Sequence, residues 1–204
     1  SIDYLGDELN LNEIRKSFYN LYPGNWSTEI ADLGNLILGE NVEQTYGRII
    51  SMLSILFEKN IIPIIIGGSH DLLYANYRAY DSFKSTVNIV NIDSNFDIGD
   101  SAKPINNLSY LGKIILDEPH NLFNYSNLGY QTYHNSQEEI DLMENLYFES
   151  YRLGEVCSNI RLSEPVMRDA DIVSIDLKSV RASELSSRQK FSPNGFDGKE
   201  ICAL

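Results

Sequence analysis

Short apolar runs alternate with helix-like segments along most of this chain, and this alternation restricts its fold more than any other feature. The runs at 61–68, 86–93 and 170–177 are dominated by Val and Ile. Nearly continuous apolar strands of this kind are typical of a parallel sheet that helices cover on both faces. We therefore predict a three-layer α/β/α fold with a mainly parallel sheet. The run "GKIIL" at 112–116 is a candidate for a further strand.

Two segments carry the three-four spacing of apolar residues that predicts an amphipathic helix. The first covers 42–60, and Asn41 before it is a good N-cap residue. The second covers 136–159 and begins with Ser136, with Glu139 three residues later, which is the pattern of a capping box. We predict one long helix over this second segment. A shorter helix is expected over 71–80.

Composition sets limits on the domain organisation and the partners. The 204 residues suit one sizeable domain, predicted to span 1–204, and the 43% of hydrophobic residues supports a packed core. The 16 Lys and Arg residues against 29 Asp and Glu give a formal net charge of −13. Such a surface repels phosphate backbones, so nucleic acid is not an expected partner. The sequence contains no run near the ~18 apolar residues that can cross a bilayer, so no membrane association is expected.

The cysteines and the first residues point to a reducing compartment. Cys157 and Cys202 are far apart and form neither a disulfide framework nor a zinc-binding pattern. Cys157 falls in a helical pattern, and we expect it to be a small core residue. Residues 1–10 are acidic and lack the apolar region of a signal peptide. A cytoplasmic location is predicted.

Polar residues follow three of the apolar runs. His70 comes after a double glycine, Asp93 is the last residue of the run at 86–93 with Asp97 four residues later, and Asp176 lies near the end of the run at 170–177. Each alone would also suit a turn or a cap. Because the carboxyl ends of parallel strands meet at one edge of a sheet, these four side chains are expected to converge. One imidazole with three carboxylates is a suitable set for a divalent metal.

Three motifs in this order resemble those of a known family. "GGSH" (67–70), "DSNFD" (93–97) and "SIDLK" (174–178) are similar to GG-D-H, D-A-H-x-D and S-x-D-x-D of the arginase, agmatinase and formimidoylglutamase (ureohydrolase) family. The resemblance runs from "DLGNL" (32–36) to the end of the chain. The stretch at 124–155 is most similar to bacterial formimidoylglutamase-type members, and "PNGF" (193–196) resembles the glycine-rich loop that follows the last motif.

The resemblance implies an arginase-like α/β/α fold and a pair of Mn²⁺ ions bridged by carboxylates. In the family the ions activate a water that attacks a guanidino or formimidoyl carbon. The positions matching the first-metal ligands are His70, Asp93, Asp97 and Asp176. The second metal shares Asp93 and Asp176 and uses a His and an Asp, whose positions here carry Asn95 and Lys178.

These two replacements conflict with a second ion. The Asn95 amide is a poor substitute for imidazole at a transition-metal site. Lys178 brings a positive charge, and its ammonium has no lone pair. We hypothesise that the Lys178 ammonium takes the place of the second metal and neutralises Asp93 and Asp176. The site would then bind one Mn²⁺ at most, or none.

Other departures leave the activity open. Arg181 stands where the family has a further Asp, and the loop at 98–115 offers no substrate-side His. Neither His120 nor His134 is expected to have a chemical role, and no catalytic residue is assigned. The family's later strands are absent, so we expect a fold that is incomplete at its C-terminal side.

Three readings follow from these observations. The first is a divergent family member, weakly active or inactive, that acts as a binding or assembly module. The second is a working hydrolase of linear amidines of the formimidoylglutamate, agmatine or arginine type that uses one metal. The third is a carboxylate–lysine network that only stabilises the domain. A small amidine is the expected substrate if the protein is active, and a homo-oligomer is expected from the family resemblance.

Overall fold

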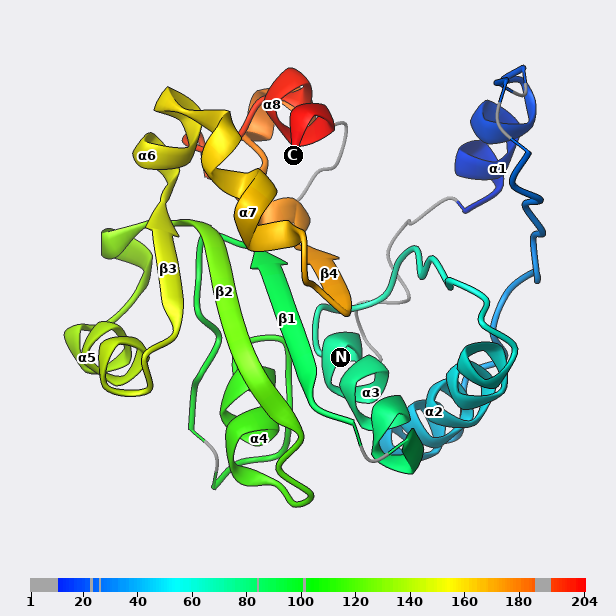
Figure 1. Cartoon of the computed structure of the whole chain (residues 1–204), viewed down its shortest axis with the longest axis horizontal. Helices are drawn as coiled ribbons and strands as arrows, with labels where there is room; N and C mark the ends of the chain where they lie inside the picture. The colour runs from blue at the N-terminus through cyan, green and yellow to red at the C-terminus, as the bar shows by residue number, and fades with distance from the viewer. Residues whose placement is uncertain (1–10, 23, 26, 84, 101, 186–191) are drawn as a thin grey trace. The chain divides into compact units, whose positions relative to one another are not determined.

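Figure 1 shows the computed structural model of the chain, which describes residues 11–22, 24–25, 27–83, 85–100, 102–185 and 192–204. The backbone forms two compact units, Ser1–Ala79 and Tyr80–Leu204. The assignment of 1–204 to one domain stays a prediction.

The first unit is helical in its described residues. Its helices are α1 (Leu11–Tyr19), α2 (Val42–Glu58) and α3 (Leu72–Arg78). The predicted N-cap of α2 is confirmed, because the Asn41 side chain accepts a hydrogen bond from the Gln44 amide at 2.8 Å. The apolar stripe of α2 places Tyr46, Ile49 and Leu53 in the core. Helices are therefore confirmed over both segments predicted in this unit.

The predicted strand at 61–68 is wrong. Residues 61–66 have no regular secondary structure, and they take part in no strand pairing among the described residues. Ile62 and Ile64 are 89% and 84% exposed. β-branched residues favour an extended backbone, yet a strand also needs a hydrogen-bonded neighbour and side-chain packing, which local sequence does not supply.

The second unit is built on a parallel sheet. Its strands are β1 (Val87–Ile92), β2 (Leu122–Tyr130), β3 (Glu149–Arg152) and β4 (Ile172–Ile175), and they lie in the order β3-β2-β1-β4 (Figure 1). All neighbouring pairs are parallel. The mainly parallel sheet is therefore confirmed. The sequence pattern does not indicate β2, because Asn124, Ser126 and Asn127 interrupt its apolar residues.

Helices cover both faces of this sheet. On one face, Val90, Ile92 and Leu128 pack with Phe196 and with Leu153 and Val156 of α6 (Leu153–Ser158). Side chains alternate along a strand, so Asn91 points to the opposite face. There its amide contacts Tyr110 of α4 (Tyr110–Leu116). The three-layer arrangement is therefore confirmed within this unit.

The remaining helices of this unit are short. They are α5 (Gln137–Asn145), α7 (Ser163–Met167), α8 (Gly198–Ala203), and the 3₁₀ turns η2 (Ala79–Phe83), η3 (Thr132–His134), η4 (Ile160–Leu162), η5 (Leu177–Ser179) and η6 (Ala182–Glu184). Among the described residues, no helix is long and apolar enough to cross a membrane.

The candidate strand at 112–116 is wrong, because these residues lie in α4. Tyr110, Leu111 and Ile114 are fully buried, at the i, i+1 and i+4 spacing of one helix face. The helix begins where the Leu111 amide donates to the Asp97 carbonyl oxygen at 3.2 Å. A short apolar run is compatible with a buried strand or a buried helix, and only its packing decides between them.

The single long helix predicted over 136–159 is also wrong. The capping box of Ser136 and Glu139 is confirmed, but α5 ends at Asn145, and Tyr147 adopts a left-handed φ of 58°. The chain then forms β3, which pairs with β2, before α6 begins. Cys157 follows the buried Val156 on α6 and is exposed, so its expected core position is wrong. The spacing of apolar residues that predicts a helix carries no information about pairing with a strand far away in the sequence.

Candidate functional site: an acidic cluster with an internal lysine

Three aspartates meet at the carboxyl edge of the sheet. Asp93 directly follows β1, and Asp176 directly follows β4. These strands are parallel neighbours with Ile92 opposite Ile175, so the two aspartates leave the sheet side by side. Asp97 joins them from the loop after β1, where its φ of 54° turns the chain back. One carboxylate oxygen from each lies within 4.8 Å of the others. The expected convergence of the carboxylates is confirmed, and their role as metal ligands stays a prediction.

Backbone amides fix the orientation of two of these carboxylates. Asp93 Oδ1 accepts a hydrogen bond from the Asn95 amide at 3.1 Å. Asp176 Oδ1 accepts one from the Lys178 amide at 2.8 Å. Asp93 and Asp97 are 0% and 3% exposed. Several buried negative charges this close together require a cation or several donors between them.

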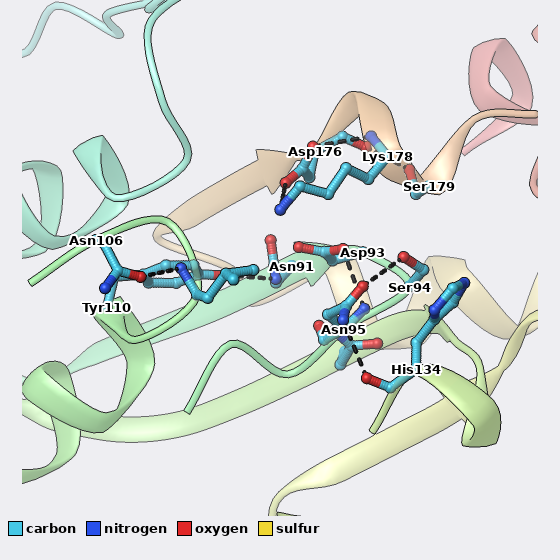
Figure 2. A network of polar contacts seen from close by, with 12 residues as sticks. Asn91, Asp93, Ser94, Asn95, Asn106, Tyr110, His134, Asp176, Lys178 and Ser179 are labelled. Atoms are coloured by element: carbon cyan, nitrogen blue, oxygen red, sulfur yellow. Dashed lines mark hydrogen bonds and ion pairs between the residues drawn. The ribbon is translucent and has the colours of Figure 1, made fainter. Parts of the chain in front are cut away.

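Lys178 supplies a cation from within the chain. Its Nζ lies 3.4 Å from Asp176 Oδ2. Figure 2 shows the lysine side chain extending past Asp176 so that its ammonium faces Asp93 and Asn91. Burial lowers the pKa of Lys178, but Asp176, Asp97 and Asp93 together outweigh it and hold this pKa above its ordinary value. The lysine is therefore charged and offsets part of the negative charge of the cluster.

Asn95 uses its side-chain amide to hold the loop. Its Oδ1 accepts a hydrogen bond from Ser94 Oγ at 2.8 Å, and its Nδ2 donates to the His134 carbonyl oxygen at 3.1 Å (Figure 2). His134 takes part in this contact through its backbone, while its ring packs on Tyr133. Both ends of the Asn95 amide thus have protein partners, and the degeneracy of this position as a metal ligand stays a prediction.

Asn135 also shapes the loop, and sequence reasoning missed it. Its Oδ1 accepts a hydrogen bond from the Phe96 amide at 2.7 Å. Its Nδ2 donates to the carbonyl oxygens of Ser94 and Gln131 at 3.0 and 2.8 Å. The residue therefore ties the loop after β1 to the end of β2. An asparagine in an Asn-rich stretch carries no local signal of such a role.

A second polar group missed by the sequence analysis lies beneath the cluster. Asn91 Nδ2 donates to the hydroxyl oxygens of Tyr110 and Tyr125, at 3.0 Å each. All three side chains are fully buried. Burial foremost, followed by Tyr125 and the three aspartates, raises the pKa of Tyr110 well above its ordinary value. The Tyr110 hydroxyl therefore stays protonated.

His70 belongs to the first unit. It lies in the turn before α3, after Gly67 and Gly68, whose positive φ angles of 95° and 82° suit glycine. Next to it, the buried Asp71 carboxylate accepts a short hydrogen bond from the Tyr46 hydroxyl of α2. Burial and this contact raise the pKa of Tyr46. The turn that carries His70 is thereby attached to α2.

The second unit also contains a pocket of about 320 Å³ at the end of β2. Gln131 and Asn194 line it and bond to each other, with Asn194 Nδ2 donating to Gln131 Oε1 at 2.9 Å. Arg181 lies 3.6 Å from both Asp197 and Glu200. Arg181 is therefore paired locally, as are the Gln131 and Asn194 side chains that line the pocket.

Comparisons with known proteins agree with this geometry. The model of the arginase family matches residues 6–201. The formimidoylglutamase of Macrococcus caseolyticus is 29% identical over 157 residues, covering 74% of this chain and 48% of that protein. The formimidoylglutamase of Lysinibacillus sphaericus is 24% identical over 145 residues, covering 69% of this chain and 44% of that protein. The chain thus spans about half the length of these curated relatives.

Solved structures show the same fold. Trypanosoma cruzi formiminoglutamase with Mn²⁺ superposes with a TM-score of 0.73 at 16% identity, covering 82% of this chain and 59% of that one. A variant of the same protein, with one asparagine replaced by histidine and again with Mn²⁺, superposes with a TM-score of 0.73 at 18% identity. The match covers 80% of this chain and 58% of the variant. Bacillus subtilis formimidoylglutamase superposes with a TM-score of 0.70 at 18% identity, covering 83% of this chain and 57% of that one. With its parallel sheet, ordered motifs and matching family model, this chain belongs to the arginase family.

Proposed function

We propose that this chain is a divergent formimidoylglutamase-like protein whose acidic site binds one Mn²⁺ at most, and that it acts as a binding or assembly module with weak hydrolase activity or none. The observation that carries the proposal is the Lys178 ammonium, 3.4 Å from Asp176 and directed into the carboxylate cluster. A lysine there neutralises charge that a second divalent ion would otherwise neutralise.

The donor set suits one ion. Asp93, Asp97 and Asp176 offer oxygens within 4.8 Å of one another. The motif resemblance assigns His70 to the same ligand set, and an imidazole added to these carboxylates would give a mixed shell suited to Mn²⁺. A bound ion would supply Lewis-acid chemistry at this edge of the sheet. The three carboxylates would hold it, and Lys178 would balance the remaining negative charge.

The donor set does not suit a second ion. Lys178 has no lone pair to offer a metal, and its charge would repel a cation held by the same carboxylates. Asn95 is less decisive, because an amide oxygen can still contact a cation, although it is a poorer ligand than imidazole. The proposal therefore rests on Lys178.

A one-metal hydrolase of linear amidines is the second candidate. It is favoured by the carboxylates of the first-metal set, all three of which are present and lie together. Its substrate would be a small amidine of the formimidoylglutamate, agmatine or arginine type. A third possibility is that the cluster only stabilises the domain, in which case neither metal nor amidine would bind.

Metal content per chain is the deciding measurement. The protein is incubated with excess Mn²⁺, exchanged into metal-free buffer and analysed by mass spectrometry. We expect one ion or none for the wild type, and two for a variant that combines Lys178→Asp with Asn95→His. The exposed Lys103→Asp serves as the control and should match the wild type. Two ions in the wild type would overturn the proposal.

Activity distinguishes the two candidate functions. The wild-type protein is tested with formimidoylglutamate, agmatine and arginine for release of formamide, ammonia or urea. Turnover that requires added Mn²⁺ would establish the one-metal hydrolase. Absence of turnover despite a bound ion would favour a binding role. The homo-oligomer and the cytoplasmic location stay predictions, and light scattering would test the first.

A further inference from the structure

Asn91 is a polar residue at the centre of a buried strand. It lies in β1 two residues before Asp93 and is 0% exposed. Its Nδ2 donates to both Tyr110 and Tyr125, at 3.0 Å each. An amide nitrogen has two hydrogens, and both are used in these bonds. The orientation of the side chain is therefore set by two tyrosines from α4 and β2.

This orientation directs the Asn91 carbonyl toward the acidic cluster. Figure 2 shows Asn91 Oδ1 on the side of Asp93 and of the Lys178 ammonium, away from the contact with Tyr110. The oxygen is buried and accepts no hydrogen bond from the residues that the structure describes. A buried carbonyl oxygen that accepts no hydrogen bond is energetically unfavourable, so we expect a hydrogen-bond donor close to it.

Lys178 is the donor that faces this oxygen. Its ammonium has three hydrogens and lies 3.4 Å from Asp176 Oδ2. The buried Nζ has no well-aligned hydrogen bond within the described part of the chain. A donor and an acceptor that both lack such a bond thus face each other beside Asp93 (Figure 2).

We propose that Asn91 is a positioning residue of this site. Its carbonyl, oriented by Tyr110 and Tyr125, accepts a hydrogen bond from the Lys178 ammonium, directly or through one water. The contact holds the ammonium among the carboxylates, where it competes with a divalent ion. Asn91 acts through Lys178 and is not itself a metal ligand. This inference rests on the proposed function, in which Lys178 occupies the place of a second metal.

The test is a double-mutant cycle with the affinity for Mn²⁺ as the readout. The proteins are the wild type, Asn91→Leu, Lys178→Met and the double variant, and titration calorimetry gives each Kd. Asn91→Leu removes a hydrogen bond to the charged ammonium, so the lysine competes less well with the ion. From the usual strength of such a bond, we expect Mn²⁺ to bind roughly ten-fold more tightly to this variant. In the Lys178→Met background, the same change should have no effect. Asn88→Leu, on the same strand, is the control and should leave Kd unchanged.

The sign of the effect separates the two roles of an amide oxygen. If Asn91 were a metal ligand, Asn91→Leu would weaken Mn²⁺ binding in both backgrounds, and the proposal would be overturned. An unchanged Kd would overturn it as well. If the leucine variant fails to fold, Tyr125→Phe keeps Asn91 and removes one orienting hydroxyl, and it should tighten binding by a smaller factor. Two ions per wild-type chain would instead overturn the proposed function.

A metal-free measurement covers the case in which the wild type binds no Mn²⁺. In protein labelled with ¹⁵N-lysine, a buried and hydrogen-bonded ammonium gives a signal protected from exchange with water. The Lys178 signal is identified by its loss in Lys178→Met. We expect Asn91→Leu to shorten its exchange lifetime several-fold, whereas an unchanged lifetime would overturn the proposal.

Discussion

Replacing Lys178 by methionine tests whether the lysine balances the acidic cluster. Methionine keeps most of the aliphatic stem, so packing changes little and the charge is lost. Asp93, Asp97 and Asp176 would then be left without this cation. We expect the variant to be less stable than the wild type in EDTA, and we expect Mn²⁺ to restore most of the loss.

The distance in the structure sets the size of the effect. Two unit charges at the 3.4 Å between Lys178 Nζ and Asp176 Oδ2 attract by about 5 kcal/mol at an effective dielectric constant of about 20, and by about 1 kcal/mol in bulk water. Asp93 and Asp97 add to this attraction, and desolvation of the ammonium opposes it. Removing one partner of a buried pair costs about 3–5 kcal/mol. Because Lys178 is 30% exposed, we expect about 3 kcal/mol.

Thermal unfolding provides the assay. For a chain of this length, a loss of about 3 kcal/mol lowers Tm by roughly 10 °C. Mn²⁺ at about a hundred times its Kd stabilises the folded state by about 2.7 kcal/mol, which nearly offsets that loss. Lys103→Met is the control: Lys103 Nζ lies 3.3 Å from Asp100, but both side chains are exposed, so no measurable change is expected.

Two outcomes would contradict this reasoning. The first is an unchanged Tm for Lys178→Met in EDTA, which would mean that the carboxylates do not require the lysine. The second is a Tm loss that Mn²⁺ does not reduce. In that case the lysine would stabilise the fold without competing with a metal. This outcome would favour the reading in which the carboxylate–lysine network only stabilises the domain.

Two further predictions concern other parts of the second unit. Partial desolvation of the Cys157 sulfur and its contact with Glu200 raise the pKa of this thiol to about 11, although the residue as a whole is exposed. Its alkylation by iodoacetamide at pH 8 should therefore be roughly a hundred-fold slower than for a thiol with a pKa of about 9, and the rate should rise about ten-fold per pH unit. The reaction is followed in a Cys202→Ser background. Gly129 has a φ of 103°, and an added Cβ would lie 2.5 Å from the Phe196 ring. Gly129→Ala should therefore destabilise by about 3 kcal/mol in urea titrations, whereas the uncrowded Gly154→Ala should not.

Much of the site was predictable from local pattern. The aspartates at 93 and 176 directly follow two apolar runs, and parallel strands bring such residues to one edge regardless of the details of packing. The capping box at Ser136 was likewise predictable from the sequence, because both of its partners lie within one helical turn. Lys178, which the family resemblance places at a metal-binding aspartate position, is visible in the motif itself.

Other features depend on residues far apart in the chain. The run at 112–116 is a helix because it packs on the sheet, and 149–152 is a strand because β2 lies beside it. The orientation of Asn91 requires Tyr125, which is 34 residues away.

The sequence alone thus determined which aspartates stand at the ends of β1 and β4, because the position of a polar residue after an apolar run is a local property. Only the tertiary structure decided what surrounds those charges, because burial and hydrogen bonding of a polar group depend on every element packed against it.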